Sequence, residues 1–340
     1  MFLFPLRHAW MIRSVIAGEW PSLPRVFGWL LLLTTNLPLT GLACEFVEPH
    51  KVYVGMYVDR ITGVSLKENQ FSADCRIWFR WTSDEINPLD TFEITNGHIE
   101  SKDAIYRSKI SNYNYAVCRV TTKINKLWDV SRFPLDSHTL SIEVEDTDRE
   151  LHKQHYVPDT ENCSLDPDAQ VAGWLISAQE PKVTEHRYNT NYGDTSLPTG
   201  HESQWSRFIF SIRIERAGYA SFIKLFSGLF VSAAIALLSL LIRPTDLDPR
   251  FGLGVGAMFA AVASEYILVS SLPETNGLTM ADKLHVLTFV YIFLTLAESA
   301  LSLKLMTEGK QAASRTLDRR AFGFLSATYC LFVTGIICLT

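Results

Sequence analysis

The sequence predicts a β-sandwich that leads directly into a bundle of four membrane-spanning helices, because its 340 residues divide into two parts of opposite character. Residues 45–217 alternate apolar and polar side chains with period two, as half-buried strands do. Residues 218–340 contain long apolar runs instead, and the mean hydropathy of the whole chain is close to zero. We therefore expect residues 44–217 to form an extracellular antiparallel β-sandwich and residues 218–340 to form a transmembrane domain.

Residues 1–43 predict a signal peptide. A short apolar run at residues 26–39 follows Arg25, and the small residues at 41–43 resemble a cleavage site. An uncleaved membrane anchor is the alternative, and Met11 offers a second start besides Met1. Both interpretations predict that the following domain is exported.

The strand pattern is clearest in four stretches, each with one apolar face. Pro, Gly, Asn and Asp residues separate these stretches, which is typical of short strands in an antiparallel sandwich. The apolar faces are Val52, Val54, Met56 and Val58; Ile77, Phe79 and Trp81; Leu140, Ile142 and Val144; and Phe208, Phe210, Ile212 and Ile214.

The sandwich carries no signature of an enzyme or of a nucleic-acid-binding protein. Residues 45–217 hold 19 Lys and Arg against 27 Asp and Glu without a basic stripe, which argues against nucleic acid as a partner. No phosphate loop, GxSxG motif or ordered Ser/His/Asp arrangement is present, so the sequence predicts neither catalytic residues nor a cofactor.

The six cysteines follow the same division, and none has the CxxC or Cys/His spacing of a metal site. The exported part contains Cys44, Cys75, Cys118 and Cys163, which could form disulfides whose pairing the sequence leaves open. We expect Cys330 and Cys338, in the last apolar run, to act as small apolar side chains.

The apolar segments approach or exceed the length of about 20 residues that a bilayer helix needs. They cover residues 219–242, 250–272, 284–306 and 321–340. Lys and Arg concentrate in residues 303–320, whereas residues 271–283 hold only Lys283. The positive-inside rule therefore predicts that residues 303–320 are cytoplasmic and that the sandwich lies outside the cytoplasm.

The second apolar segment is unusual for a helix that faces lipid only. It contains Gly252, Gly254 and Gly256, and each interior glycine costs about 1 kcal/mol of helix propensity relative to Ala. Glu265, and Glu298 in the third segment, should face protein or water, because a carboxylate in a bilayer is costly. The glycines predict either a pore lining or close helix packing.

Local motifs in this arrangement resemble those of the pentameric ligand-gated ion channels. Residues 54–81 (VGMYVDRITGVSLKENQFSADCRIWFRW) look like the first two strands of the proton-gated prokaryotic members. Residues 128–140 (WDVSRFPLDSHTL) resemble the signature loop of the family, with its Phe-Pro-x-Asp core at residues 133–136. Residues 250–254 (RFGLG) and 271–273 (SLP) resemble the second membrane helix of glycine- and GABA-type receptors. The similarity covers about residues 45–340.

The chain lacks the two cysteines that flank the signature loop in animal receptors, because Lys126 and Leu140 stand at their positions. Prokaryotic members lack this disulfide as well, so the resemblance implies a multi-pass protein of a bacterial inner membrane. It also implies a homopentamer in the lipid bilayer, in which the second membrane helix of each subunit lines a pore for inorganic ions.

At about 100° per residue, the helical face that carries Asp248 matches the pore-lining positions of the family. This face comprises Asp248, Gly252, Gly256, Phe259, Ala263, Ile267 and Ser270. Five copies of Asp248 would attract cations at the cytoplasmic mouth, although a role for Asp248 as the helix N-cap is an equal alternative. Rings of Phe259 and Ile267 would gate the pore by dewetting.

Two features at the cytoplasmic end of this helix predict opposite ion selectivities. Pro249 and Arg250 resemble the Pro-Ala-Arg motif of anion-selective receptors, whereas Asp248 stands where cation-selective prokaryotic relatives have a glutamate. Since Arg250 points away from the pore face and Asp248 towards it, we expect a cation channel. An anion channel of the same fold is one alternative, and a non-conducting membrane receptor or anchor is another.

The resemblance implies that contacts between the sandwich and the helices open the pore. These contacts are expected at Lys67, Glu68, Pro134, Asp136, Arg216 and Pro273. Asp136 and Arg216 stand at positions that pair in relatives, and their ion pair would either transmit strand motion to the helices or act as a static bridge.

The resemblance also implies a ligand site between subunits, beneath a hairpin around residues 187–205. The candidate residues are Tyr188, Tyr192, His201, Trp205 and, from the neighbouring subunit, Trp78. Their rings would cage an organic cation, or else pack strands. A second stimulus, protons or calcium as a modulator, is predicted at Glu143, Glu145, Asp146 and Asp148, unless these carboxylates form a solvated face. The sequence does not identify the agonist.

Overall fold

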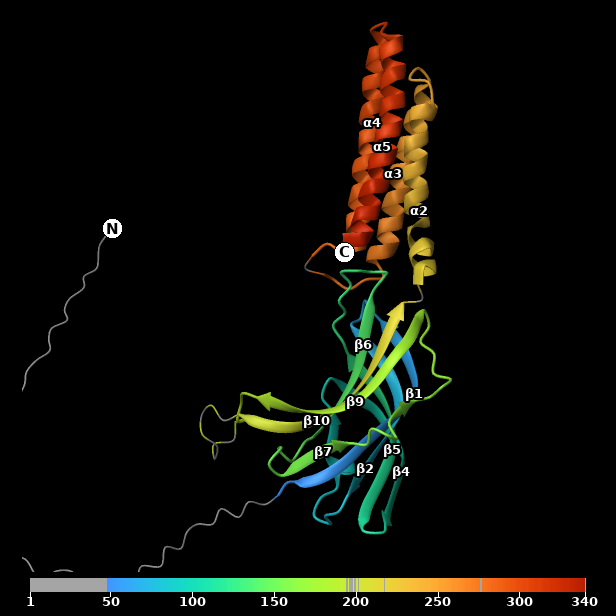
Figure 1. The fold of residues 1–340 in the computed structure, drawn as a ribbon. Coiled ribbons are helices and arrows are strands. Elements are labelled where there is room, and N and C mark those ends of the chain that lie inside the picture. The colour runs from blue at the N-terminus through green and yellow to red at the C-terminus, as the bar shows by residue number, and fades with distance from the viewer. Residues whose placement is uncertain are drawn as a thin grey trace, which may run out of the picture. The chain divides into compact units, whose positions relative to one another are not determined.

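Two β-sheets form the N-terminal domain, as the period-two pattern predicts (Figure 1). The computed structural model describes residues 48–193, 195, 198, 200, 202–216, 218–275 and 277–339. The predicted signal peptide at residues 1–43, Cys44, His201 and the predicted domain boundary at Ala217 lie outside the described residues.

The first sheet has the strand order β4, β5, β2, β1, β7, and β8 also pairs with β1. These strands are β1 (His50–Ser65), β2 (Gln70–Trp81), β4 (Gly97–Ile110), β5 (Tyr113–Asn125), β7 (Gln154–Pro158) and β8 (Ser164–Leu165). The pairs among β1, β2, β4 and β5 are antiparallel, whereas β7 and β8 run parallel to β1. This edge differs from the expected antiparallel sandwich, because the chain crosses over from the second sheet before it pairs with β1.

The second sheet has the order β3, β6, β10, β9 and is antiparallel throughout. Its strands are β3 (Phe92–Ile94), β6 (Ser137–Asp146), β9 (Trp174–Tyr188) and β10 (Ser203–Arg216), and the short helix α1 (Pro88–Thr91) precedes β3. Long antiparallel pairings such as β9 with β10 place alternate side chains on opposite faces of the sheet.

The core of the sandwich consists of the residues that the alternation predicts. Every residue of the four predicted apolar faces on β1, β2, β6 and β10 is at most 6% exposed. Residues between them, such as Trp78 on β2 and Arg207 on β10, point outwards and are only half-buried. Because burial of each face excludes a one-residue slip in register, the outward side chains are held at defined positions.

The C-terminal domain contains four helices that are long and apolar enough to cross a membrane, and Figure 1 shows them side by side. They are α2 (Gly218–Leu238), α3 (Leu247–Val269), α4 (Met280–Thr307) and α5 (Gln311–Leu339), and the 3-10 turn η1 (Ser239–Leu241) extends α2. A β-rich domain followed by four candidate spans is the architecture expected of a multi-pass membrane protein.

α5 begins well before its apolar run. The helix starts at Gln311 rather than at residue 321, so the predicted cytoplasmic loop at residues 303–320 is mostly helical. Residues 308–310 alone connect α4 to α5. The difference arises because apolarity predicts where a helix enters the bilayer, whereas the polar residues at 311–320 include good helix formers that continue it beyond that point.

The cysteines of the described sandwich are free rather than paired. Cys75 and Cys118 are buried on neighbouring strands but are not direct cross-strand partners, and Cys163 is buried elsewhere in the domain. The disulfides that these cysteines could form are therefore absent among the residues that the structure describes. Cys330 and Cys338 are exposed on α5 instead of filling space inside the bundle of one chain.

Gly97 begins β4 at a point where no side chain fits. A Cβ atom there would lie 2.3 Å from the carbonyl oxygen of Lys123 and 2.9 Å from Cα of Ile124, both on β5. We expect Gly97→Ala to lower the free energy of unfolding by about 1–3 kcal/mol, because the β4–β5 pair has to move apart. Thermal unfolding of the detergent-solubilised protein, followed by circular dichroism, measures this change. The control is Gly228→Ala on α2, where a Cβ meets open space, and equal effects of the two changes would contradict the prediction.

Candidate functional site

α3 has one face that the rest of the chain covers and another that is open. The covered face comprises Arg250, Gly254, Ala257, Ala261 and Leu268. The residues predicted to line a pore are all exposed within one chain: Asp248, Gly252, Gly256, Phe259, Ala263, Ile267 and Ser270. The helical repeat therefore identified a face of α3 that its own chain leaves open, and its role as a pore lining stays a prediction.

Asp248 lies in the first turn of α3, and its side chain is exposed. Asp246 occupies the N-cap position, so the alternative in which Asp248 caps the helix is wrong. A carboxylate in the first turn is still favourable there, because the positive end of the helix dipole attracts it. The charge of Asp248 is thus open to solvent at the start of the helix.

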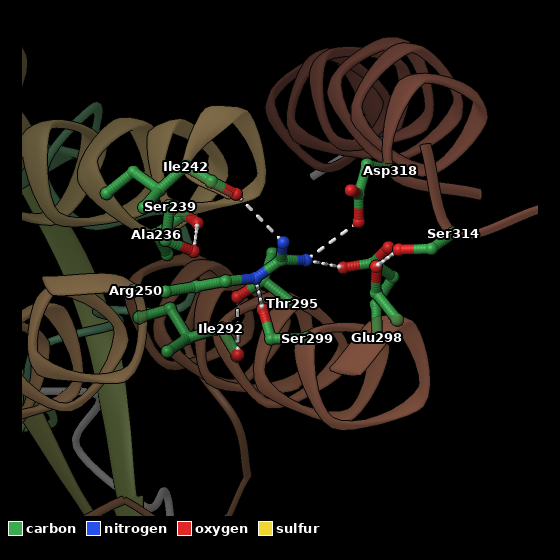
Figure 2. A network of polar contacts seen from close by, with 11 residues as sticks. Ala236, Ser239, Ile242, Arg250, Ile292, Thr295, Glu298, Ser299, Ser314 and Asp318 are labelled. Atoms are coloured by element: carbon green, nitrogen blue, oxygen red, sulfur yellow. Dashed lines mark hydrogen bonds and ion pairs between the residues drawn. The ribbon is translucent and has the colours of Figure 1, made fainter. Parts of the chain in front are cut away.

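Arg250 is fully buried on the covered face of α3, and its guanidinium binds groups from three other segments (Figure 2). Nε donates to Oγ of Ser299 on α4 at 2.9 Å. Nη1 donates to the carbonyl oxygen of Ile242, which directly follows η1, at 2.9 Å. Nη2 donates to Glu298 on α4 at 2.9 Å and to Asp318 on α5 at 2.8 Å. This network ties α3 to the end of α2, to α4 and to α5.

The two carboxylates of the network are largely buried, with side-chain exposures of 8% for Glu298 and 12% for Asp318. Oε1 of Glu298 has no hydrogen-bond partner within the part of the chain that the structure describes. Ser314, which shares a hydrogen bond of 2.8 Å with Ser302, lies beside Glu298 (Figure 2). The expectations that Arg250 faces away from the open face and that Glu298 lies inside the bundle are confirmed.

A second charged cluster lies where the sandwich ends and the helices begin. Arg216, the last residue of β10, donates from Nε to Oδ1 of Asp136 at 2.8 Å. Nε2 of His138 lies 2.6 Å from the other oxygen of Asp136, so two side chains share this carboxylate. The guanidinium of Arg216 also lies over the rings of Phe133 and Trp174, at 4.5 and 4.3 Å from their centroids. Asp136 and His138 are buried, so the cluster is shielded from water.

The surroundings of Asp136 keep its carboxyl group ionised. Burial by itself would raise the pKa of Asp136. The hydrogen bond with His138 and the positive charge of Arg216 outweigh burial and lower the pKa below its ordinary value. Asp136 is therefore negatively charged at neutral pH and holds Arg216 at the junction.

The loop that carries Asp136 also contacts a helix directly. The backbone N–H of Met280, the first residue of α4, donates to the carbonyl oxygen of Ser131 at 2.8 Å. Pro134, Asp136 and Arg216 line a crevice of about 300 Å³ next to the start of α2. The same loop thus lies against the beginnings of α2 and α4.

The other residues predicted for this junction lie apart from that crevice. Lys67 and Glu68 are exposed in the turn between β1 and β2, and Pro273 is half-buried in the loop between α3 and α4. The structure therefore brings together half of the predicted gating residues, those of the signature loop and the end of β10. Their role in gating stays a prediction.

Trp78 on β2 lines a cavity of about 540 Å³ on the outer side of the first sheet. Its indole Nε1 donates to Oδ2 of Asp159 at 3.0 Å. Gly55 lies opposite on β1 and leaves room for the indole, because a Cβ there would lie 2.3 Å from the ring. The remaining lining residues are Arg80, Ile110, Ser111, Tyr113, Tyr115 and Asn162. Aromatic walls with one carboxylate and one guanidinium suit a small ligand that has both apolar and polar parts.

Tyr188 and its neighbours lie on the second sheet, away from this cavity. The hydroxyl of Tyr188 donates to Glu145 at 3.0 Å and accepts from Arg207 at 3.0 Å. Its ring makes edge contacts with the rings of His186 and Tyr192, with centroids 4.5 and 6.0 Å apart. Burial and then the charge of Glu145 raise the pKa of Tyr188 to about 12, so the hydroxyl stays protonated at neutral pH.

The other residues predicted to bind a ligand belong to the same hairpin, and the structure describes two of the three. Trp205 pairs with His186 across β9 and β10 and is half-buried, while Tyr192 is 65% exposed. His201 lies outside the described residues. One chain therefore gathers the aromatic residues of the hairpin but not Trp78, which the resemblance assigns to the neighbouring subunit.

The carboxylates predicted to bind calcium do not surround a common point. They are Glu143, Glu145, Asp146 and Asp148. Glu143 and Glu145 share one side of β6 and bind Arg207, at 2.6 and 2.5 Å. Asp146 lies on the other side of the strand and accepts a hydrogen bond from Gln154 at 3.1 Å. No group of three or more His, Cys, Asp and Glu side chains could hold a metal ion among the described residues. Within the described residues these four side chains do not gather into a calcium site, because side chains alternate along a strand and one guanidinium takes up two of the four charges; calcium as a modulator stays a prediction.

Sequence reasoning missed the residues that complete these sites: His138, Asp159, Arg207 and Asp318. Arg207 had a local signal, since it is a charged residue at an outward position of a strongly apolar strand. No local sequence signal pointed to Asp159 or Asp318. Their partners, Trp78 and Arg250, lie 81 and 68 residues away in sequence.

Asp136→Asn should destabilise the protein in a pH-dependent way. Its pKa is lower folded than unfolded, so the charged form stabilises the folded state above its unfolded pKa, and this contribution disappears as the pH falls towards the folded value. We expect a loss of about 1.5–3 kcal/mol above about pH 5, shrinking below about pH 4. Thermal unfolding over this pH range measures the difference. Asp103→Asn, an exposed change on β4, is the control, and a gap between wild type and Asp136→Asn that does not depend on pH would refute the prediction.

The described chain thus presents an open helix face with Asp248, a charged junction at Asp136 and Arg216, and aromatic sites on both sheets. Comparison with models of known protein families gives no match for this chain, and no curated protein matches it. Its function is therefore inferred from its own residues and their geometry.

Proposed function

We propose that the chain is one subunit of a homopentameric, cation-selective ion channel that an extracytoplasmic stimulus opens. The observation that carries this proposal is the open face of α3, which begins with the exposed Asp248 while the neighbouring cation, Arg250, is buried and paired. A membrane helix with a carboxylate on an uncovered face needs water or other subunits there. A ring of five copies around a water-filled axis supplies both.

The side chains along that face suit a cation pore. Five Asp248 carboxylates at one mouth attract cations and repel anions. Phe259 and Ile267 are 72% and 63% exposed within one chain, and as rings they would close the pore by dewetting. Gly252 and Gly256, between Asp248 and Phe259, add no polar ring to this part of the pore, which leaves selectivity there to Asp248.

The junction of sandwich and helices supports opening from the extracytoplasmic side. Arg216 connects β10 to the loop of Asp136, and Ser131 in this loop holds the first residue of α4. A movement of the sandwich that displaces the loop would therefore move the beginnings of α2 and α4 together. These helices pack on the covered face of α3 and would shift its open face.

The proposed stimulus is a small ligand at the subunit interface or a change in proton concentration. The cavity at Trp78 would face Tyr188 and Tyr192 of the neighbouring subunit, and aromatic rings of this kind bind organic cations. Protons have a candidate receptor in Glu93, which lies directly opposite Glu145 across β3 and β6. Burial, and then the charges of Glu145 and its neighbour, raise the pKa of Glu93.

Current through the purified protein in a planar bilayer under a tenfold KCl gradient tests the proposal. We expect a reversal potential near the K⁺ equilibrium value when pH is stepped or organic amines are added. Asp248→Ala should lower the ratio of K⁺ to Cl⁻ permeability about tenfold or more, because five negative charges leave the mouth. The matched control is Asp246→Ala, which removes an exposed carboxylate at the same end of α3 but not on the pore face.

Each alternative function has its own outcome in this experiment. A reversal potential near the Cl⁻ value would favour an anion channel, and a permeability ratio unchanged by Asp248→Ala would remove this residue from the pore. Monomers or dimers in native mass spectrometry would favour a non-conducting receptor or anchor.

Phe259→Ala tests whether an apolar ring closes the pore. Removing five aromatic rings lowers the cost of wetting the constriction, so we expect a higher open probability at rest. Single-channel recording measures it. Phe293→Ala on α4 is the control, since this side chain is 63% exposed but not on the pore face. A resting open probability equal to that of wild type would locate the gate elsewhere.

A further inference from the structure

We propose that Glu298 and Asp318 determine the ion selectivity of the pore although neither lies in it. They hold the guanidinium of Arg250 on the covered face of α3 and compensate its charge, so that Arg250 does not offset the charge of Asp248 at the cytoplasmic mouth. This inference rests on the proposed function and names the residues that regulate its selectivity.

Arg250 is close enough to the mouth to oppose Asp248 if it were free. The two residues differ by two positions, which is about 200° around the helix but only about 3 Å along its axis. An arginine side chain is long and flexible, and next to a water-filled pore its charged end would normally turn towards the water. Arg250 does not do so, since its side chain is 0% exposed.

The hydrogen bonds of the guanidinium explain why it stays on the covered face. Donors on all three nitrogens are occupied, by Ser299, Ile242 and the two carboxylates, at distances of 2.8–2.9 Å (Figure 2). Because the donors of a guanidinium point in fixed directions within one plane, partners from α4, α5 and the end of α2 fix its orientation. Rotation towards the pore would leave several of these buried groups unpaired.

The carboxylates of the network compensate the positive charge of Arg250 where it lies. One guanidinium meets two carboxylates, so its positive charge is compensated as long as either Glu298 or Asp318 is ionised. An ion in the pore then experiences a compact group of opposite charges on the far side of α3 instead of an isolated cation. Asp248 has no such ion-pair partner among the residues that the structure describes, and it lies on the exposed side of the helix. The mouth of the proposed pore is therefore negatively charged, although Arg250 is only two positions from Asp248.

The test replaces both carboxylates by amides of the same shape. In E298Q/D318N the guanidinium keeps hydrogen-bond acceptors but loses its countercharges, so the ratio of K⁺ to Cl⁻ permeability should fall about tenfold or more. The triple variant R250Q/E298Q/D318N has no charge in the network and should return to within about twofold of the wild-type ratio. The matched control D246N/E308Q removes two exposed carboxylates at the same end of the helices and should leave the ratio nearly unchanged.

Two results would overturn the inference directly. One is an unchanged permeability ratio in E298Q/D318N. The other is a triple variant shifted as far as the double variant, because the shift would then not come from Arg250. If E298Q/D318N does not assemble as a pentamer in native mass spectrometry, the permeability ratio of the triple variant tests the inference instead. A ratio equal to wild type supports the inference, and a markedly higher ratio means that Arg250 already repels cations in the wild type, which overturns it.

A failure of the proposed function gives a different result from a failure of this inference. A wild type that selects Cl⁻ overturns both proposals, whereas a silent wild type counts against the channel and leaves only the pairing of Arg250 to be tested. In that case, thermal unfolding of the protein in detergent tests whether Arg250 is paired with Glu298 and Asp318. R250Q should lower the Tm by at least about 4 °C because it leaves two buried carboxylates unpaired, and the triple variant should recover most of this loss. An R250Q protein as stable as wild type would show that the network does not hold the charge, and the inference would fall.

Discussion

One buried cation organises the helical domain. Arg250 has no access to water, and an isolated guanidinium in a protein interior is too costly to persist. It is tolerated because Glu298 and Asp318 reach it from α4 and α5, while Ile242 offers a carbonyl oxygen from the end of α2. Breaking such a buried pair costs about 3–5 kcal/mol. The contact therefore fixes how the helices meet and, as a consequence, which face of α3 stays open with Asp248 on it.

The same chemistry recurs at the opposite end of the helices. There Arg216 binds Asp136, and the rings of Phe133 and Trp174 cover the guanidinium. This second cluster joins a strand to a loop, whereas the first joins helices to one another. One guanidinium–carboxylate cluster thus lies at the junction with the sandwich, and the other lies at the opposite ends of the helices. In the proposed channel, α2 and α4 would carry a displacement of the sandwich, because both helices begin at the junction and also bind Arg250 at their other ends.

Side chains suited to ligand recognition are divided between the two sheets. Trp78 and its cavity belong to the first sheet, where Gly55 makes room for the indole, and Tyr188 belongs to the second. The carboxylates near Tyr188 are engaged by Arg207, so they orient the tyrosine hydroxyl rather than bind a metal ion. In the proposed homopentamer, neighbouring subunits would bring the Trp78 side of one chain and the Tyr188 side of the next to the same interface.

Features that repeat over short distances were predictable from the sequence alone. Period-two alternation identified the buried faces of four strands, and the helical repeat separated Asp248 from Arg250 on α3, because both patterns follow from local backbone geometry. The partners of the buried polar groups, in contrast, depend on how the whole chain folds. Asp318 lies 68 residues from Arg250, and Asp159 lies 81 residues from Trp78. No local pattern encodes such a pairing, since a buried polar group binds whatever the packing of the whole chain brings within hydrogen-bond distance.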